Sequence, residues 1–174
     1  MRKLALLALS TALLSGAAFA AGEPMVGGAA MFPSKNIIQN AVNSKDHTTL
    51  VAAVKAAGLV ETLEGKGPFT VFAPTNEAFA ALPSGTVDTL LKPENKATLT
   101  KILTYHVVAG KLEASALTDG KVLKTVQGED LTVKRSGDKI MIIDAKGGSS
   151  TITIENVNQS NGVIQVVDTV LMPS

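Results

Sequence analysis

The chain has 174 residues, no cysteine and a formal net charge of +1, with sixteen Lys and Arg against fifteen Asp and Glu. This length is typical of one domain. The lack of cysteine excludes disulfides and a lipid-modified N-terminal cysteine. Basic residues form no cluster, and aromatic residues make up only 3% of the chain. We therefore expect no nucleic-acid partner, because such surfaces combine basic patches with stacking aromatics.

The first twenty residues have the pattern of a secretory signal peptide. A basic n-region precedes residues 4–14, which are almost wholly apolar, and residues 18–20 read Ala-Phe-Ala, a small-x-small cleavage pattern. The apolar run is too short for a membrane anchor, which takes about 20 apolar residues. We predict a signal peptide over 1–20, cleaved after Ala20 or Ala21, and no transmembrane anchor. Cleavage removes two basic residues, and the secreted protein, periplasmic or extracellular, then carries a net charge of −1.

Helical patterns follow a stretch of Gly, Ala and Pro over residues 21–34, which predicts a flexible leader. Asp46 is placed to cap the second helix, and His47 is expected at the surface in its first turn. Gly58 stands where a glycine ends that helix. The predicted helices cover residues 36–42, 46–57, 76–81 and 86–91, and a segment after Pro93.

Strand patterns dominate the second half of the chain. Residues 131–134 and 151–154 alternate with period two, and the continuous apolar run 140–143 is predicted to be buried on both faces. Turn residues at 136–138 and 146–149 indicate an antiparallel meander. Early helices followed by antiparallel strands predict an α+β fold with the helices packed on one side of the sheet.

Few side chains in the sequence suit catalysis or metal binding. His47 and His106 are the only histidines, and no G-x-S-x-G motif is present. His106 follows Tyr105 at the end of an apolar helix, which favours a packed, hydrogen-bonded imidazole over a catalytic one. A zinc site takes three or four ligands. We expect no catalytic residue, no metal and no cofactor, and a hydrolase is only a minor alternative.

The segment 70–79, TVFAPTNEAF, predicts a sharp corner between a strand and a helix. A β-branched and aromatic run ends at a proline, which stops a strand, and the threonine after it is placed as the N-cap of a helix. Two phenylalanines supply bulk on either side of the corner. The structural residues predicted for this segment are Thr70, Phe72, Ala73, Pro74, Thr75, Asn76 and Phe79.

Two later segments have patterns of their own. In residues 103–108, LTYHVV, the helical periodicity turns into a strand pattern. In residues 161–173, NGVIQVVDTVLMP, a turn starts an apolar strand that a proline ends. The structural residues predicted for the last segment are Asn161, Gly162, Asp168 and Pro173.

Together, in this order and spacing, the three segments resemble the fasciclin (FAS1) domain. Residues 70–79 resemble its first signature, Tyr105-His106 its tyrosine-histidine pair, and 161–173 its second signature. The resemblance covers roughly residues 35–173 and implies one FAS1 domain. Its fold is a β-wedge or sandwich of mostly antiparallel strands with helices packed along one side. The chain is similar to the short, single-domain secreted members found in bacteria.

The resemblance implies adhesion through a protein or polysaccharide at a cell surface or in the matrix, and not catalysis. It indicates Tyr105 and His106 as adhesive residues, although a buried structural pair is an equal alternative. Asn156 and Val157 match the family's adhesive Asp-Ile pair; without the acid, a metal-dependent receptor of the integrin type is not expected. A single domain has one modest surface, so avidity requires many copies or self-association.

The alternative function is an extracytoplasmic carrier of a small apolar ligand such as a lipid, because the chain is aliphatic and poor in aromatics.

Overall fold

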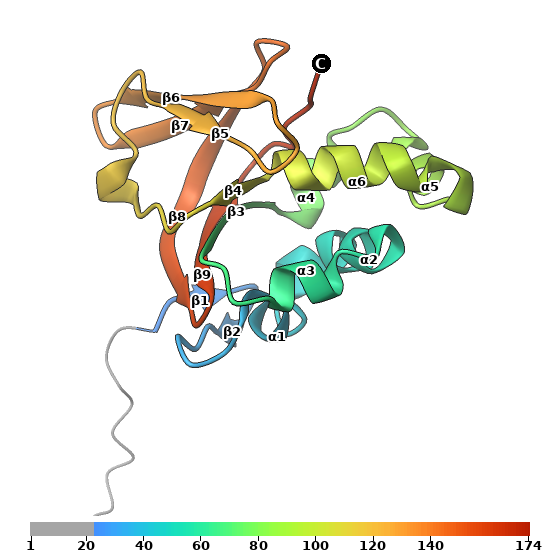
Figure 1. Ribbon diagram of the computed structural model, residues 1–174, viewed down its shortest axis with the longest axis horizontal. Coiled ribbons are helices and arrows are strands. Elements are labelled where there is room, and N and C mark those ends of the chain that lie inside the picture. Colours follow the sequence, from blue (N-terminus) through green and yellow to red (C-terminus); the bar gives the residue numbers. More distant parts are fainter. Residues whose placement is uncertain (1–22) are drawn as a thin grey trace, which may run out of the picture.

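A computed structural model describes residues 23–174, and the predicted signal peptide with Ala20 and Ala21 lies outside this range. One seven-stranded sheet has the order β4-β3-β9-β8-β7-β6-β5, and the helices lie together on one side of it (Figure 1). Every neighbouring pair is antiparallel except β3 and β9, which are parallel. The predicted α+β class, with helices along one side of a mostly antiparallel sheet, is confirmed.

Except for the helix Val60–Glu64, which the sequence patterns do not predict, the α-helices of residues 23–174 begin and end close to the residues that the sequence predicts. Asn36 forms a capping box with Gln39 at the start of the first helix, and Gly58 ends the second in a left-handed conformation, as a C′ glycine does. The helices are α1 (Ile37–Ala41), α2 (Thr48–Ala57), α3 (Val60–Glu64), α4 (Asn76–Ala80), α5 (Thr86–Leu90) and α6 (Lys96–Tyr105).

The sheet curls until its first and last strands meet. An isolated bridge joins Val108 to Thr125, and therefore joins the edge strand β4 to the edge strand β5. β8 pairs with both β7 and β9 and has register shifts between Ile152 and Val157, which allow it to bend between the two halves of the sheet. The strands are β3 (Phe69–Pro74), β4 (Val107–Ala109), β5 (Val122–Lys124), β6 (Asp130–Ser136), β7 (Lys139–Ile143), β8 (Ser149–Gln159) and β9 (Gly162–Val167).

Two hydrophobic cores lie on opposite faces of β3. Val71 and Ala73 belong to a core shared with the helices, whereas Phe72 belongs to a second core inside the curled sheet. Because side chains of a strand alternate between faces, one short apolar strand serves both cores. β9 does the same with Val166 and Val167.

The N-terminal segment differs from the flexible leader predicted over residues 21–34. β1 (Met25–Val26) pairs with β2 (Ala29–Ala30) in a small hairpin. Val26 and Met31 are buried in the core that the sheet shares with the helices. The Gly, Ala and Pro composition of this segment does not predict that the side chains of Val26 and Met31 anchor the hairpin to the domain.

Two further expectations about burial are wrong. Residues 140–143 alternate: Ile140 and Ile142 are buried, whereas Met141 and Ile143 are half-buried, because β7 faces the inner core on one side only. His47 is buried instead of exposed. Within residues 23–174 no helix is both long and apolar enough to cross a membrane.

Candidate functional site

The tyrosine-histidine pair is buried at the end of α6. The exposed fractions of Tyr105 and His106 are 0% and 2%. The Tyr105 hydroxyl donates to the carbonyl of Asp130 at 3.1 Å and accepts from the N–H of Ala145 at 2.8 Å. These contacts join α6 to the first residue of β6 and to the β7–β8 loop, so the phenol is a structural link.

The ring of His106 makes a hydrogen bond with each nitrogen. Nδ1 lies 2.8 Å from the carbonyl of Ile102, and Nε2 lies 2.9 Å from the backbone nitrogen of Leu171. A carbonyl only accepts and an N–H only donates, so Nδ1 carries the proton and Nε2 accepts. Burial lowers the pKa of His106 to about 4, against the opposing effect of the Ile102 carbonyl. The imidazole is therefore neutral at ordinary pH, and both nitrogens are occupied.

Asn156 and Val157 occupy a bend in β8. Asn156 has a left-handed backbone with φ of 55°, a conformation that asparagine tolerates better than most residues. Its side-chain oxygen accepts from the N–H of Ala114 at 2.7 Å and from Gln165 Nε2 at 3.3 Å. Val157 is fully buried. Tyr105, His106 and Val157 are thus buried and expose no surface to a partner, whereas Asn156 is half-buried. The adhesive role of these four residues stays a prediction.

The first signature builds the corner that its pattern predicts. Thr75 accepts from the N–H of Ala78 and caps α4. Asn76 then reaches a second helix: its side-chain oxygen accepts from the N–H of Thr49 at 3.0 Å, in the first turn of α2. Asp46, the cap that we predicted for α2, makes no such bond, because the residue that satisfies this turn comes from elsewhere in the chain.

The buried residues of the first signature link β3 to its neighbours. The hydroxyl of Thr70 donates to the carbonyl of Gly110 at 2.6 Å and accepts from the N–H of Leu112 at 2.8 Å. Pro74 is the last residue of β3 and lies opposite Val167 of β9. The side chains of Phe72, Ala73 and Phe79 are buried.

The second signature is centred on Asn161, which is buried and whose side chain contacts two helices, α1 and α3. Its side-chain oxygen accepts from the N–H of Ile37 at 3.1 Å, and its side-chain nitrogen donates to the carbonyls of Leu63 at 2.6 Å and Gly65 at 2.8 Å. A Cβ on Gly162 would overlap the carbonyl of Phe69. The asparagine-glycine turn, which joins β8 to β9, therefore secures α1 and α3 at the start of β9.

The end of the second signature secures the C-terminal segment. Asp168 is exposed, but its carboxylate accepts from the N–H of Thr151 at 2.8 Å, where β8 passes β9. Pro173 is buried beyond the last strand. Each of the eleven predicted signature residues thus has a structural position in the fold.

An open groove of about 540 Å³ lies where β4 and β5 fail to pair along their length. Beyond the bridge, the N–H of Val126 donates to the carbonyl of Val107 at 2.8 Å. Val122 and Val126 line the groove and are 59% and 47% exposed. Sequence reasoning missed this groove, because it exists only once the sheet has curled.

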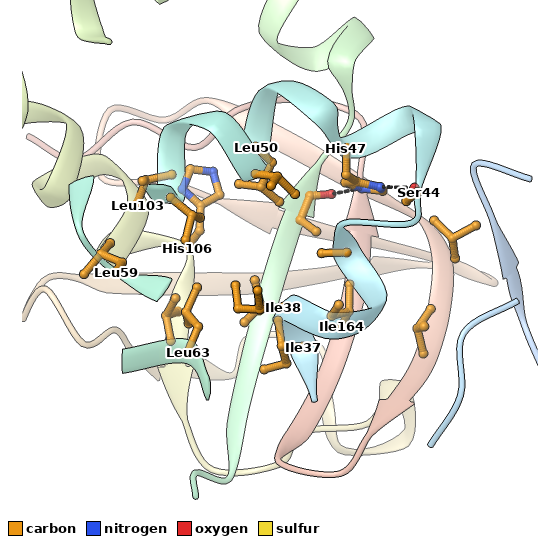
Figure 2. Close-up of a pocket in the computed structure, with 18 of the residues that line it drawn as sticks. Ile37, Ile38, Ser44, His47, Leu50, Leu59, Leu63, Leu103, His106 and Ile164 are labelled. Atoms are coloured by element: carbon orange, nitrogen blue, oxygen red, sulfur yellow. Dashed lines mark hydrogen bonds between the residues drawn. The ribbon is translucent and has the colours of Figure 1, made fainter. Parts of the chain in front are cut away.

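A second space lies inside the domain, between the helices and the sheet. It holds about 40 Å³, and Figure 2 shows His106 at one side of it, His47 and Ser44 at the other, and Ile38 and Leu50 between them. The remaining lining side chains are apolar and come from α1, α2, α3, α6, β3, β4, β8, β9 and the N-terminal hairpin.

The polar atoms around this cavity are satisfied within the protein. The Ser44 hydroxyl lies 2.9 Å from Nδ1 of His47, and Nε2 of His47 lies 3.4 Å from the carbonyl of Ala73. Burial lowers the pKa of His47. A guest in the cavity would therefore meet carbon and neutral, occupied polar groups. Among residues 23–174, no group of three or more acidic or histidine side chains is arranged to hold a metal ion.

The geometry identifies the class of protein. The family model described as "Fasciclin domain" matches residues 45–173, and the chain belongs to this family. The fold is similar to "a FAS1 Domain Pair from the Insect Cell Adhesion Molecule Fasciclin I", with a TM-score of 0.71 and 16% identity. The match covers 79% of this chain and 51% of that one.

Curated bacterial proteins are more similar in sequence. "Protein sll1483" of Synechocystis is 50% identical over 149 residues, which is 86% of this chain and 79% of that protein. "Cell surface glycolipoprotein MPB83" of Mycobacterium bovis is 40% identical over 157 residues, which is 87% of this chain and 66% of the relative. "Immunogenic protein MPB70" of the same species is 38% identical over 138 residues, covering 76% and 66% of the two chains.

Proposed function

We propose that this protein is a secreted, non-enzymatic adhesion module that contacts a protein at a cell surface or in the surrounding matrix. The family supports this function, since one structural relative is named as a cell adhesion molecule and one sequence relative as a cell surface glycolipoprotein. The structural observation that carries the proposal is the groove between β4 and β5. Of the five large apolar side chains exposed within residues 23–174, Val122 and Val126 line it.

The free edge of β5 faces this groove. The carbonyl of Lys121 accepts from Val133, and the N–H of Thr125 donates to Glu129, so these residues are directed toward the β6 side. Main-chain groups alternate in direction along an antiparallel strand. The N–H and C=O groups of Val122 therefore point away from β6 and into the groove.

An extended segment of a partner protein fits these groups. Such a segment adds to a sheet edge through main-chain hydrogen bonds, with side-chain contacts giving specificity. Val122 and Val126 provide the apolar contacts. Lys124 lines the groove and is exposed, which favours an acidic side chain on the partner, whereas the Lys121 ammonium is occupied by the carbonyl of Ala116 at 2.8 Å. The partner we propose is an extended, acidic protein segment.

The experiment uses fluorescently labelled protein, residues 21–174, and cells of the source organism that lack their own copy. Val122→Ser combined with Val126→Ser is expected to weaken binding about tenfold or more, because burial of a valine side chain contributes about 1.5 kcal/mol or more. Val42→Ser is the matched control, since Val42 is 50% exposed and lies at the end of α1. Equal binding by all three proteins, or no saturable binding by any, would overturn the proposal.

Treatment of the cells identifies the kind of partner. Loss of binding after mild protease treatment supports a protein partner. Loss after glycosidase treatment alone assigns a polysaccharide and overturns the proposed occupant. Concentration-dependent dimers in sedimentation, abolished by the valine substitutions, assign the groove to a second copy of this chain and also overturn it.

A second candidate function is that of an extracytoplasmic carrier of a small apolar ligand, and the internal cavity favours it. A space lined by apolar side chains, with its few polar groups already hydrogen-bonded, takes an apolar guest more readily than water. Native mass spectrometry of protein purified from its own cells is the test. A co-purifying apolar mass supports the carrier function, and the mass of the bare chain from cells in every growth state rejects it.

A further inference from the structure

The internal cavity has the size and the chemistry of a site for a compact apolar group. Its volume is about 40 Å³, roughly three times the 10–15 Å³ that one water needs. Water requires two to four polar partners, and the polar atoms of the lining already have theirs. The space therefore favours a hydrocarbon group of a few carbon atoms over water or a charged ligand.

One wall of the cavity is the N-terminal hairpin, defined here as residues 24–31. Val26 and Met31 are buried and line the cavity. The strands of the hairpin pair with each other and with no strand of the large sheet. In the described part of the chain, one hydrogen bond joins the hairpin to the rest of the domain, from the N–H of Lys45 to the carbonyl of Gly27 at 3.2 Å. The half-buried Ala29 packs against the same core. A segment held by three apolar side chains and one hydrogen bond opens at low cost.

The contact surface of the hairpin is the turn that precedes α2. A Cβ on Gly27 would overlap the Ser44 hydroxyl and lie 2.7 Å from the backbone nitrogens of Lys45 and Asp46. A Cβ on Gly28 would meet nothing within 4 Å. Both glycines have left-handed backbones, with φ of +58° and +76°, so a side chain strains both positions. Only at Gly27 would a methyl group also push the hairpin off the turn.

From these contacts we infer that the cavity is a binding site for a compact, uncharged hydrocarbon group and that the N-terminal hairpin is its lid. The inference rests on the second candidate function, the carrier, and names its site and its opening. A space of about 40 Å³ accepts only a small group. Displacement of Val26 and Met31 connects the space to solvent and lets a longer aliphatic chain enter by one end.

The test uses two probes, xenon and n-hexane, with residues 21–174 labelled at the methyl groups of Ile, Leu and Val. Xenon is expected to shift the methyl signals of Ile38, Leu50 and Ile164, which line the cavity. The methyl signals of Leu131 and Ile142, buried in the other core, serve as an internal control. n-Hexane is expected to bind slowly, because it requires the lid to open.

Gly27→Ala is expected to speed the uptake of n-hexane about tenfold, because it weakens the closed state of the lid. Gly28→Ala is the matched control and should leave the uptake rate as in the unaltered protein. If Gly27→Ala does not fold, Val26→Ser replaces it, since this change loosens the lid without altering the turn.

Each outcome decides one part of the inference. If xenon shifts the cavity signals but all variants take up n-hexane at the same rate, the cavity stands as a binding site and the lid is overturned. The absence of xenon shifts in every variant overturns the site. Xenon binding by protein that carries no guest when purified from its own cells supports the site and rejects the carrier function, so the two failures are distinguishable.

Discussion

Nε2 of His106 accepts a hydrogen bond from the backbone N–H of Leu171 at 2.9 Å, across 65 residues of sequence. This contact fixes the C-terminal segment against the end of α6. It is available only to the neutral imidazole, because a protonated ring has no acceptor nitrogen. The contact between His106 and Leu171 is therefore expected to weaken when the imidazole is protonated.

Stability is expected to fall in mild acid because of His106. Its pKa is about 4 in the folded protein and 6.5 in an ordinary environment. Between these values the unfolded chain binds a proton that the folded chain does not, so the free energy of unfolding falls as the pH falls. The full contribution, about 3 kcal/mol, is present above pH 6.5 and is lost by pH 4. Urea unfolding at intervals from pH 7.5 to 4 measures it.

A substitution separates His106 from the carboxylates, which also titrate in acid. His106→Gln keeps an acceptor for Leu171 but cannot take up a proton, so its unfolding free energy should vary less between pH 6.5 and 4. His47→Gln is the comparison, since burial lowers the pKa of His47 in the same direction. Parallel curves for His106→Gln and the unaltered protein would contradict the assignment.

The sequence predicts the local elements of this fold well, because their signals are local. The capping residue of α4, the glycine that ends α2 and the alternation of β6 all act within a few residues. The helix α2 shows the limit. Its first turn is satisfied by Asn76, 27 residues beyond Thr49, and no periodicity in the sequence connects the two.

The candidate sites were harder to predict than the fold. The groove depends on the bridge between Val108 and Thr125, which forms only when the sheet curls. The cavity depends on Val26 and Met31, two apolar residues inside a segment whose composition indicates flexibility. Both sites are made by contacts between distant parts of the chain. Local sequence patterns do not predict such contacts, and only a family resemblance indicates them.

Removal of the Tyr105 hydroxyl is expected to reduce stability without affecting adhesion. Tyr105→Phe removes the hydrogen bonds to Asp130 and Ala145, and each is worth about 0.5–1.5 kcal/mol net because water can reach both backbone groups. The melting temperature should fall by about 2–4 °C for each kcal/mol. Binding of the folded variant to source cells, measured well below its melting temperature, should match that of the unaltered protein. Lost binding with an unchanged melting temperature would instead support the adhesive role of the pair.

Asn161→Ala is expected to be among the more damaging substitutions in this chain. It leaves the N–H of Ile37 and the carbonyls of Leu63 and Gly65 without a partner in a buried place, at a cost of about 3 kcal/mol or more. Asn95→Ala is the matched control, because the Asn95 side chain makes one exposed bond to the carbonyl of Thr89. Thermal unfolding of both variants measures the difference. Equal melting temperatures would show that the contacts of Asn161 contribute little.

Val122→Pro distinguishes main-chain pairing in the groove from simple apolar contact. Proline has no N–H and is tolerated on a strand where that N–H faces away from the neighbouring strand. Because the N–H of Val122 faces the groove, the variant should fold with a modest loss of stability and lose binding to source cells. Val122→Ala keeps the N–H and shortens the side chain, so it should bind with intermediate affinity. Leu123→Pro, whose N–H is directed toward β6, should fail to fold.

The binding of Val122→Pro and Val122→Ala distinguishes strand addition from contact with the Val122 side chain alone. Strand addition requires that proline reduce binding more than alanine, because proline removes a main-chain donor that alanine retains. Equal losses in the two folded variants would mean that the partner contacts only the Val122 side chain. Circular dichroism and melting temperature establish that each variant is folded before its binding is compared. Retained binding by Val122→Pro would exclude pairing of the partner with this edge of β5.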